Sequence, residues 1–447
     1  CTVNPDSVPA CALDATGARF AKAGEDFSAT VTATQFNGSA TPNYGNEISA
    51  EGVRLTSNIV LPALGVNPLL TNASVFGSFS SGVATGTTFR WDEVGIITLT
   101  PSVADGDYLI AGDVTGTTSG NVGRFYPDHL LLTQGTLTNR SLSVCAPVST
   151  FTYAGEQMQI ATFTLTARNG AAAPTVNYNT ANSFAKFDGS IIGNFNLGAV
   201  DLADAIAPLT ATALTGSLNG VSSSGSWVAG VGTFTVNLSL NRAATPDGPY
   251  ESFSIGTVPT DTDGVQLNSY DVDTDLNASN DRGLIASAGK VRFGRLKLFN
   301  AHGSELLGLT IPMQAQYWNG TEFILNGNDS CTAIAAANVT MSAYQPNLTA
   351  CETAVSASGN FSSGKANLQL TAPGINNNGS VDMTVNLGAI ASGTTCAPGP
   401  GVAITANRPY LQGNWGGSAT YDKNPTGRAT FGVYKGRDEF IYLRENY

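Results

Sequence analysis

An internal repeat constrains the fold of this chain more than any other feature of its sequence. Residues 20–25 (FAKAGE) and 151–156 (FTYAGE) share the pattern F-x-x-A-G-E. In both copies a stretch of alternating apolar and polar residues follows, and then an Asn-Gly pair. A third, weaker copy begins at residues 303–305 (GSE) and ends at Asn319 and Gly320. Self-similarity of this kind, in a chain of 447 residues, predicts three related modules.

The stretch after each copy alternates with a period of two residues, which is the period of a β-strand. Thr30, Thr32 and Thr34 fall on one face, whereas Val31 and Ala33 fall on the other. One buried and one solvated face is typical of antiparallel sheets, and Asn-Gly pairs favour tight hairpin turns. We therefore predict an all-β fold made of tandem immunoglobulin-like antiparallel β-sandwich domains, arranged as an elongated molecule.

The three modules are expected at residues 1–122, 123–290 and 291–447. Residues 89–110 read as a strand, a turn, a second strand and a late tyrosine, Tyr108. That order is found in immunoglobulin-like sandwiches. An Asp-rich loop ends the second module, and the third contains a cysteine cluster and a terminal hairpin.

Charge and hydropathy restrict the partners and the location of the protein. The net charge is −12, and no basic stripe offsets it, so nucleic acid is not an expected partner. No apolar run reaches the ~20 residues of a membrane helix, so no membrane span is expected. Only 12% of the residues are charged, and uncharged polar residues alternate with apolar ones, as in many secreted β-proteins. We expect an extracellular, cell-surface protein.

The six cysteines are expected to form disulfides, because no CxxC pattern or Cys/His cluster suggests a zinc site. They are Cys1, Cys11, Cys145, Cys331, Cys351 and Cys396. Proximity in sequence favours Cys1–Cys11 and Cys331–Cys351, which leaves Cys145 with Cys396, but other connectivities remain open. The alternative is free buried thiols. Disulfides imply export through an oxidising compartment.

An Asp-rich loop carries the metal-site pattern of the sequence. Carboxylates at alternate positions suit calcium, which takes 6–8 oxygen ligands. The pattern is not an EF-hand, because Leu276 and Arg282 stand where that loop needs glycine and glutamate. The alternative is a solvated acidic loop. The expected ligands are Asp271, Asp273 and Asp275, with Asp261 and Asp263 if the intervening strand folds back.

No catalytic set is present, so an enzyme is not expected. His129 and His302 lack a neighbouring nucleophile or partner in the sequence and are predicted to be structural. Arg292 and Arg295 fall on opposite faces of a strand, where one of them can pair with the acidic loop or both can be ordinary surface charges. Most tryptophans are expected in the core. Trp415, in a Gly-rich stretch, is the candidate for a sugar-stacking platform.

The C-terminal residues read as a final hairpin, with arms RATFGVY and EFIYLREN. In one interpretation the second arm closes the sheet of the third module. In the other it adds to a sheet of a neighbouring chain through main-chain hydrogen bonds. Phe440, Tyr442 and Leu443 are then the assembly residues, and removal of residues 437–447 should abolish assembly.

Several segments resemble one protein family over nearly the whole chain. They are GRFYPDHL (123–130), FTYAGEQ with LTARNG (151–170), the Asp-rich loop leading into VRFGRLKL, GSE to DSC (303–331), and the terminal hairpin. Together they resemble the C-terminal region of MshQ-like proteins, which are encoded with mannose-sensitive haemagglutinin pili, a class of type IV pilus. The N-terminal lectin-like domain that family members often carry is not seen here.

The resemblance implies an exported, pilus-associated protein with an adhesive or structural role and no chemistry. We therefore expect a structural or adhesive component of a cell-surface pilus or fibre, with pilus subunits or copies of itself as partners. The alternatives are a self-polymerising filament subunit joined by β-strand addition, and a secreted carbohydrate-binding module with surface glycans as ligands.

Overall fold

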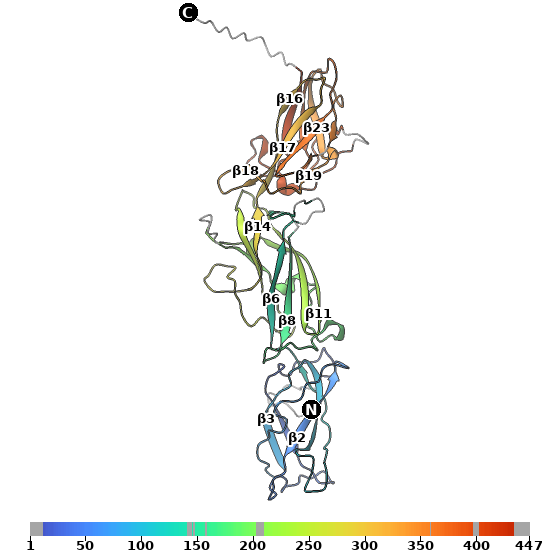
Figure 1. Ribbon diagram of the computed structural model, residues 1–447, viewed down its shortest axis with the longest axis vertical. Helices are drawn as coiled ribbons and strands as arrows, with labels where there is room; N and C mark the ends of the chain where they lie inside the picture. Colours follow the sequence, from blue (N-terminus) through green and yellow to red (C-terminus); the bar gives the residue numbers. More distant parts are fainter. Residues whose placement is uncertain are drawn as a thin grey trace, which may run out of the picture.

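The molecule is an elongated row of three β-sandwich modules joined end to end (Figure 1). The computed structural model describes residues 12–140, 145, 148–156, 159–202, 210–357, 359–396 and 402–432. Within these ranges the chain forms β-strands and short 3-10 turns, and no α-helix. None of those turns is long and apolar enough to cross a membrane. The predicted all-β class of tandem sandwiches is confirmed.

The first module packs two small sheets around an aromatic core. One sheet pairs β1 (Phe27–Thr32) with β3 (Val83–Phe89), and the other has the order β2 (Val53–Leu61), β4 (Gly95–Val103), β5 (Val122–Phe125). Phe89, Trp91 and Phe125 are fully buried between the sheets. Phe125 meets Phe20 and Phe27 edge to face, which is a favoured geometry for aromatic pairs.

The second module is a larger sandwich. Its first sheet has the order β11 (Leu218–Val228), β12 (Val231–Leu240), β8 (Gln159–Arg168), β6 (His129–Thr138). Its second sheet has the order β10 (Thr212–Ala213), β9 (Gly198–Asp201), β13 (Tyr250–Thr257), β14 (Gly283–Arg292), β7 (Thr152–Tyr153). Trp227 and the rings of Phe163, Phe195 and Phe234 fill the space between the sheets.

The third module repeats this plan. One sheet has the order β15 (Gly294–Leu298), β17 (Leu309–Trp318), β23 (Lys365–Leu370), β21 (Val355–Ala357), with β18 (Phe323–Leu325) beside β17. The other has the order β16 (Ala301–Gly303), β25 (Thr426–Phe431), β24 (Gly379–Val385), β20 (Val339–Pro346). A small separate pair joins β19 (Ala333–Ile334) to β22 (Gly359–Asn360).

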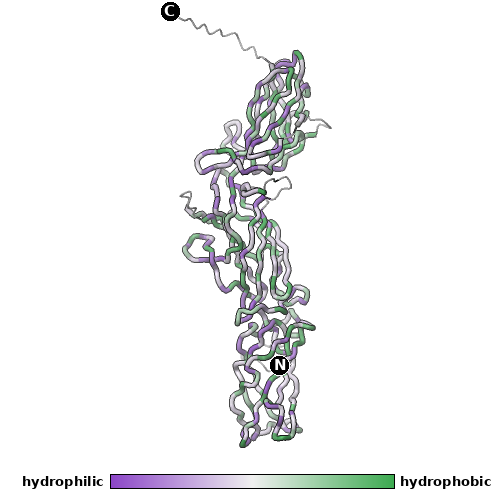
Figure 2. Tube along the Cα trace, viewed as in Figure 1, coloured by the Kyte–Doolittle hydropathy of each residue, from purple (hydrophilic) through white to green (hydrophobic). Residues whose placement is uncertain are grey.

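The strands follow the predicted alternation because neighbouring side chains point to opposite faces of a sheet. In β1, Ala29 is buried, whereas Thr30 and Thr32 are exposed and Val31 is half-buried. Figure 2 shows hydrophilic and hydrophobic residues intermixed along the trace of all three modules. The cores therefore lie inside each sandwich.

The modules are joined by continuous strands with very short connections. Three residues separate β5 from β6, and only Phe293 separates β14 from β15. Core residues also cross the boundaries: Val94 and Ile96 pack in the core of the second module, and Phe151 and Tyr153 pack in that of the third. The last strand of one module thus runs straight into the first strand of the next.

Candidate functional site

The repeated motif forms the same turn at the start of two modules. In residues 20–25, the Glu25 carboxylate accepts a hydrogen bond from the Lys22 backbone N–H at 2.8 Å. In residues 151–156, Glu156 accepts one from the Tyr153 N–H at 3.2 Å. The glycine before each glutamate has a φ of 82° or 85°, a conformation that other residues rarely adopt. The motif is conserved within the chain because this turn needs both residues. We call it the lead-in turn.

Each lead-in turn lies beside the strand that leaves its module. Lys22 pairs in parallel with Tyr126, and β7 pairs in parallel with β14. In the third copy, β16 pairs in parallel with β25. The turns therefore lie at the contacts between consecutive modules. We call the contact of modules one and two the first joint, and that of modules two and three the second joint.

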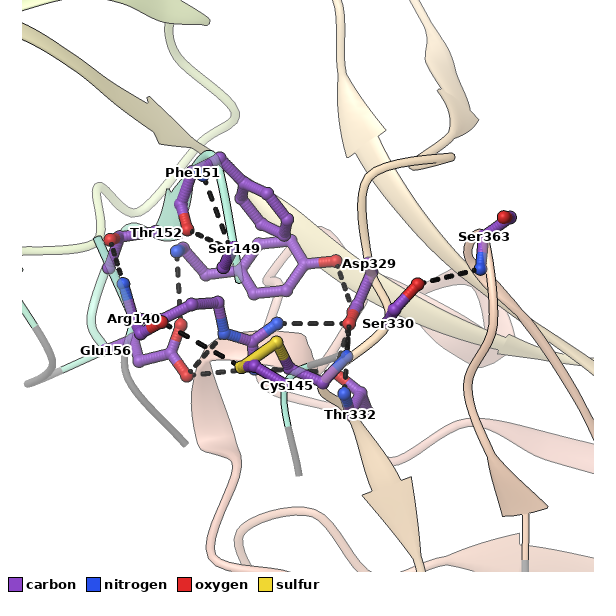
Figure 3. Close-up of a disulfide and its surroundings, with 12 residues drawn as sticks. Arg140, Cys145, Ser149, Phe151, Thr152, Glu156, Asp329, Ser330, Thr332 and Ser363 are labelled. Carbon is purple, nitrogen blue, oxygen red and sulfur yellow. Dashed lines mark hydrogen bonds and ion pairs between the residues drawn. A yellow bond between two sulfur atoms is a disulfide. The ribbon is translucent and has the colours of Figure 1, made fainter. Parts of the chain in front are cut away.

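A buried arginine lies at the centre of the second joint (Figure 3). Arg140 is fully buried and donates to Glu156 Oε1 at 3.1 Å and to Asp329 Oδ1 at 3.1 Å. Burial alone would lower the pKa of Arg140, but the two carboxylates outweigh it and raise the pKa. Arg140 is therefore charged and links the second module to the third.

Two tyrosines complete this ion network. The Tyr153 hydroxyl donates to Asp329 Oδ2, and the Tyr410 hydroxyl donates to Glu156 Oε1, both at 2.9 Å. Burial, and then the nearby Glu156, raise the pKa of Tyr410 to about 12. Both carboxylates are thus satisfied by donors on each side of the joint, as a buried charge requires.

A disulfide fixes the same joint covalently. Cys145 is bonded to Cys331, across 186 residues of sequence. The second disulfide joins Cys351 to Cys396 within the third module. The predicted pairs Cys331–Cys351 and Cys145–Cys396 are therefore wrong, because the fold brings Cys145 to the third module at the joint. Cys1 and Cys11 lie outside the described residues.

A second arginine anchors the joint from the end of β12. Arg242 donates to the backbone carbonyls of Tyr421 (2.7 Å), Gly294 (2.9 Å) and Gln412 (2.8 Å). Its guanidinium lies 3.9 Å from the centre of the Phe293 ring. Burial lowers the pKa of Arg242 to about 10, so it is still protonated at neutral pH. The guanidinium of this one residue thus binds three backbone carbonyls of the third module at once.

The first joint is held differently. Arg124 makes a bidentate ion pair with Asp263, at 2.7 and 2.6 Å, and both side chains are at least nine-tenths buried. The Glu93 carboxylate accepts from the backbone N–H groups of Val176 (2.6 Å) and Asn177 (3.0 Å) in the second module. Burial raises the pKa of Glu93. No disulfide crosses this joint within the described ranges.

Two of the predicted calcium ligands, Asp261 and Asp263, are used beside the first joint, and of these Asp263 contacts module one. Asp261 accepts from the Tyr178 hydroxyl at 2.9 Å and from the Val265 N–H at 2.9 Å. Burial raises the pKa of Asp261. Asp263 is occupied by Arg124. Asp263 therefore joins the two modules, and Asp261 holds the turn that carries Asp263, since it accepts from the Asp263 N–H at 2.9 Å.

The Asp-rich loop itself is organised by its own carboxylates. Asp273 accepts from the backbone N–H groups of Leu276 (2.7 Å) and Ala278 (2.8 Å), and Asp271 accepts from Leu284 N–H at 2.6 Å. All five predicted ligands are described. Among the described residues, no group of three or more acidic, His or Cys side chains is placed to hold a metal ion. Calcium binding stays a prediction.

The remaining candidates have structural partners. Arg292 pairs with Glu251 at 2.9 Å and not with the acidic loop, while Arg295 lies over the rings of Phe323 and Trp415. Trp415 is half-buried and one face of its ring carries Arg295, so a sugar has no free access to that face. The assembly residues Phe440, Tyr442 and Leu443 lie outside the described residues.

Sequence reasoning missed the centre of the second joint. Arg140 and Asp329 stand in unremarkable local sequence, and only their distance in the chain (189 residues) hides their contact. One signal was available: Glu156 belongs to the repeated motif, in a chain where charged residues are rare. A glutamate that recurs at the same turn in two modules indicates that a basic partner lies near one of them.

Comparisons with known proteins place the sequence in one family. Consecutive domain models of that family match: DUF6701, second domain, at residues 1–89, third domain at 93–284, and fourth domain at 292–446. No curated protein matches the sequence. A solved structure of Yersinia pseudotuberculosis InvD is similar at 12% identity and a TM-score of 0.26, over 82% of this chain and 90% of that one, which is too weak to carry an argument. Since the three matches together span nearly the whole sequence, the chain belongs to the DUF6701 family.

Proposed function

We propose that this protein is an exported structural component of a cell-surface pilus or fibre, where it holds three modules in line and presents their surfaces for adhesive contacts. The observation that supports this proposal is the construction of the second joint. A disulfide, a buried ion network and the Arg242 fork all cross it.

Such a joint is unusual for a multidomain chain. Contacts between domains of one chain are by default small and polar, and relative motion is expected. Here the network of Arg140, Glu156 and Asp329 is stable only while the modules stay aligned, because any opening would expose or unpair buried charges. The arrangement resists bending, which is the property that a spacer in a fibre needs.

The chemistry of the chain agrees with this role. Both disulfides of the described chain require an oxidising compartment, which supports export. The resemblance to MshQ-like proteins supports a pilus-associated location. The preference for a mechanical role over a catalytic one rests on how the buried charges of the second joint are used: Arg140 pairs with Glu156 and with Asp329, so these three groups hold the modules together.

Immunogold electron microscopy of intact cells tests the location. With an antibody against this chain, we expect gold along surface fibres in the parent strain and none in a strain that lacks the gene. The deletion strain should also adhere less well under flow. Gold confined to the cell interior, or unchanged fibres and adhesion after deletion, would contradict the proposal.

Small-angle X-ray scattering of the purified full chain tests the shape. We expect a maximum dimension that corresponds to three modules in line, unchanged by salt. A broad distribution of bent forms in the oxidised protein would show that the second joint does not hold the modules in line.

A further inference from the structure

An open crevice with a volume of about 950 Å³ lies at the first joint. The first module contributes residues 16–20 and Arg124 to its lining, and the second module contributes Lys186 and residues 262–264. A volume of this size accommodates a small organic ligand rather than a single ion. The mechanical role proposed above does not require such a crevice, so its lining calls for a separate explanation.

The lining is cationic in a protein that is acidic as a whole. Three of its side chains, those of Arg19, Arg124 and Lys186, carry a positive charge, against one carboxylate, Asp263, among the described residues that line it. The whole chain has a net charge of −12. Because charges more than about 8 Å away are screened at physiological ionic strength, the local balance decides what the crevice attracts. That balance favours an anion.

Two of the three cations have no carboxylate partner. Arg124 is neutralised by its bidentate pair with Asp263. Arg19 donates to the backbone carbonyl of Asp263, and the Lys186 ammonium donates to that of Ser183 at 2.9 Å. In the part of the chain that the structure describes, neither of them forms an ion pair. A guanidinium offers five N–H donors and an ammonium three, so most of their donors are left for solvent or a ligand.

Lys186 lies where its positive charge is incompletely compensated. The residue is half-buried, and burial, followed by the nearby Arg124, lowers its pKa. The carboxylates of Asp263, Asp14 and Asp261 offset this only in part. An opposite charge close to a lysine favours its charged form. An anion in the crevice would therefore supply the compensation that Lys186 lacks.

Arg19 is exposed but has a defined position. Its guanidinium lies 5.6 Å from the centre of the Tyr126 ring, and its hydrogen bond to Asp263 crosses from the first module to the second. A side chain that is already positioned loses less conformational freedom when it binds a ligand. The planar fork of a guanidinium also matches two oxygens of a carboxylate or sulfate group.

The uncharged part of the lining suits a sugar. Thr16 and Thr262 are exposed and carry hydroxyls, and Phe20 adds an apolar wall. The Thr16 hydroxyl donates to Asp14 at 2.6 Å, which leaves its oxygen as an acceptor for a sugar hydroxyl. A bare inorganic ion would use the cations of the crevice and none of these groups.

We propose that the crevice binds an acidic saccharide, a sugar that carries a carboxylate or sulfate group, and that Arg19 and Lys186 pair with that group. The two threonine hydroxyls and Phe20 then contact the rest of the sugar. The inference rests on the proposed adhesive role and names a ligand class and a site for it.

Binding has a consequence for the first joint. Arg19 belongs to the first module and Lys186 to the second, so a ligand that pairs with both ties the two modules together. Anything that binds only the folded, closed arrangement stabilises it. Limited proteolysis between modules one and two should therefore become slower when the saccharide is present.

Isothermal titration calorimetry with the oxidised full chain tests the proposal. The acidic probes are trigalacturonic acid and sialyllactose, and their neutral counterparts are the methyl ester of the first and lactose. We expect saturable binding of at least one acidic probe at one site per chain, and no binding of its neutral counterpart. Inorganic sulfate is the probe for a bare ion and should compete only weakly.

Variants locate the site. Arg19→Gln and Lys186→Gln should each weaken binding about tenfold, because each removes a charge-assisted hydrogen bond. Thr262→Glu, which adds a carboxylate to the crevice, should abolish binding. Arg19 and Thr262 are exposed, so these two variants keep the test valid even where Lys186→Gln disturbs the fold.

Matched controls are Arg54→Gln and Lys365→Gln, which remove exposed cations outside the crevice and should bind as wild type does. Equal binding of acidic and neutral probes, or unchanged affinity in both Arg19→Gln and Thr262→Glu, would overturn the proposal. So would the lack of saturable binding for both acidic probes. Sulfate that binds as tightly as the saccharides would reduce the site to an adventitious ion only, and equal losses in the controls would show a diffuse attraction.

These results are separable from the proposed function. A chain that binds no acidic saccharide can still be a three-module rod on surface fibres, which immunogold labelling and scattering report directly. Conversely, calorimetric binding that depends on Arg19 and Lys186, combined with gold confined to the cell interior, would sink the surface role and leave the site intact.

Discussion

The two joints use the same turn in different surroundings. At the first joint Glu25 is exposed and only caps the backbone of Lys22. At the second joint Glu156 caps the equivalent backbone group and is also buried against Arg140. Burial has turned a local cap into one end of an ion network between modules. The repeated motif therefore sets the backbone, while its surroundings set the strength of the joint.

The difference extends to the other contacts. The first joint has the buried ion pair Arg124–Asp263, the more exposed pair Lys22–Asp128, and backbone donors to Glu93. The second has a disulfide, a three-residue ion network and the Arg242 fork. Since the second joint adds a covalent bond and a second buried carboxylate to its ion network, we expect the first joint to yield before the second.

The largest loss is expected for Arg140→Met. It leaves Glu156 and Asp329 buried without a counter-charge, so the free energy of unfolding should fall by about 3–5 kcal/mol in urea denaturation. Arg90→Met, which breaks the surface pair with Asp26, is the control and should change little. Equal losses for the two variants would show that the network adds no stability.

Removal of the inter-module disulfide should cause the second-largest loss in the free energy of unfolding. Cys145→Ser with Cys331→Ser frees a long loop of the unfolded chain, and we expect a loss of about 2–4 kcal/mol. Limited proteolysis should then cut between modules two and three first. Cleavage still concentrated between modules one and two would mean that the ion network alone makes the second joint the stronger one.

Arg124→Met should have a smaller effect than either change. It removes the partner of Asp263, but that carboxylate borders an open pocket and can recruit water, so about 1–3 kcal/mol is expected. The measurement is again urea denaturation. A loss as large as that of Arg140→Met would refute the ranking of the two joints.

Acid should weaken the second module beside its joint. Burial raises the pKa of Glu251, but hydrogen bonds from Arg292 and Lys290 outweigh it and hold the pKa below its usual 4.5. The stability from this group is therefore present above about pH 4.5 and is lost as the pH falls through the lower folded-state pKa. Glu251→Gln should flatten that part of the acid dependence of the unfolding free energy. An unchanged pH dependence of the unfolding free energy in this variant would show that Glu251 does not contribute to the loss of stability in acid.

Calcium should have the smallest effect. If the Asp-rich loop binds it, a calcium titration should raise the thermal midpoint and the protease resistance slightly, and Asp273→Asn should abolish the gain. Identical melting curves with calcium and with a chelator would show that the loop does not bind calcium in a way that stabilises the protein.

The sequence was sufficient to predict the fold class, because the strands of a β-sandwich show a two-residue alternation of apolar and polar side chains. The alternation of Thr30 to Thr34 and the repeated F-x-x-A-G-E turn both survive in the structure as predicted. These signals are local, since each depends on residues within a few positions of one another.

The joints could not be predicted because their partners are remote. Cys331 lies near Cys351 in sequence but bonds Cys145, and Asp263 lies near other aspartates but pairs with Arg124. Which groups meet is decided by the stacking of modules, and no periodicity reports that. The aspartates of the predicted calcium site show the same dependence: backbone N–H groups donate to Asp271 and Asp273, and a remote cation, Arg124, pairs with Asp263.

The position of the Cys145–Cys331 bond has a mechanical consequence. When the two ends of the chain are pulled apart, tension follows the covalent path, and at Cys145 that path crosses the sulfur bridge to Cys331. The residues between them, most of the second module, are then bypassed. Under such tension the outer modules would carry the load, while most of the middle module would stay unloaded for as long as the bridge stays oxidised.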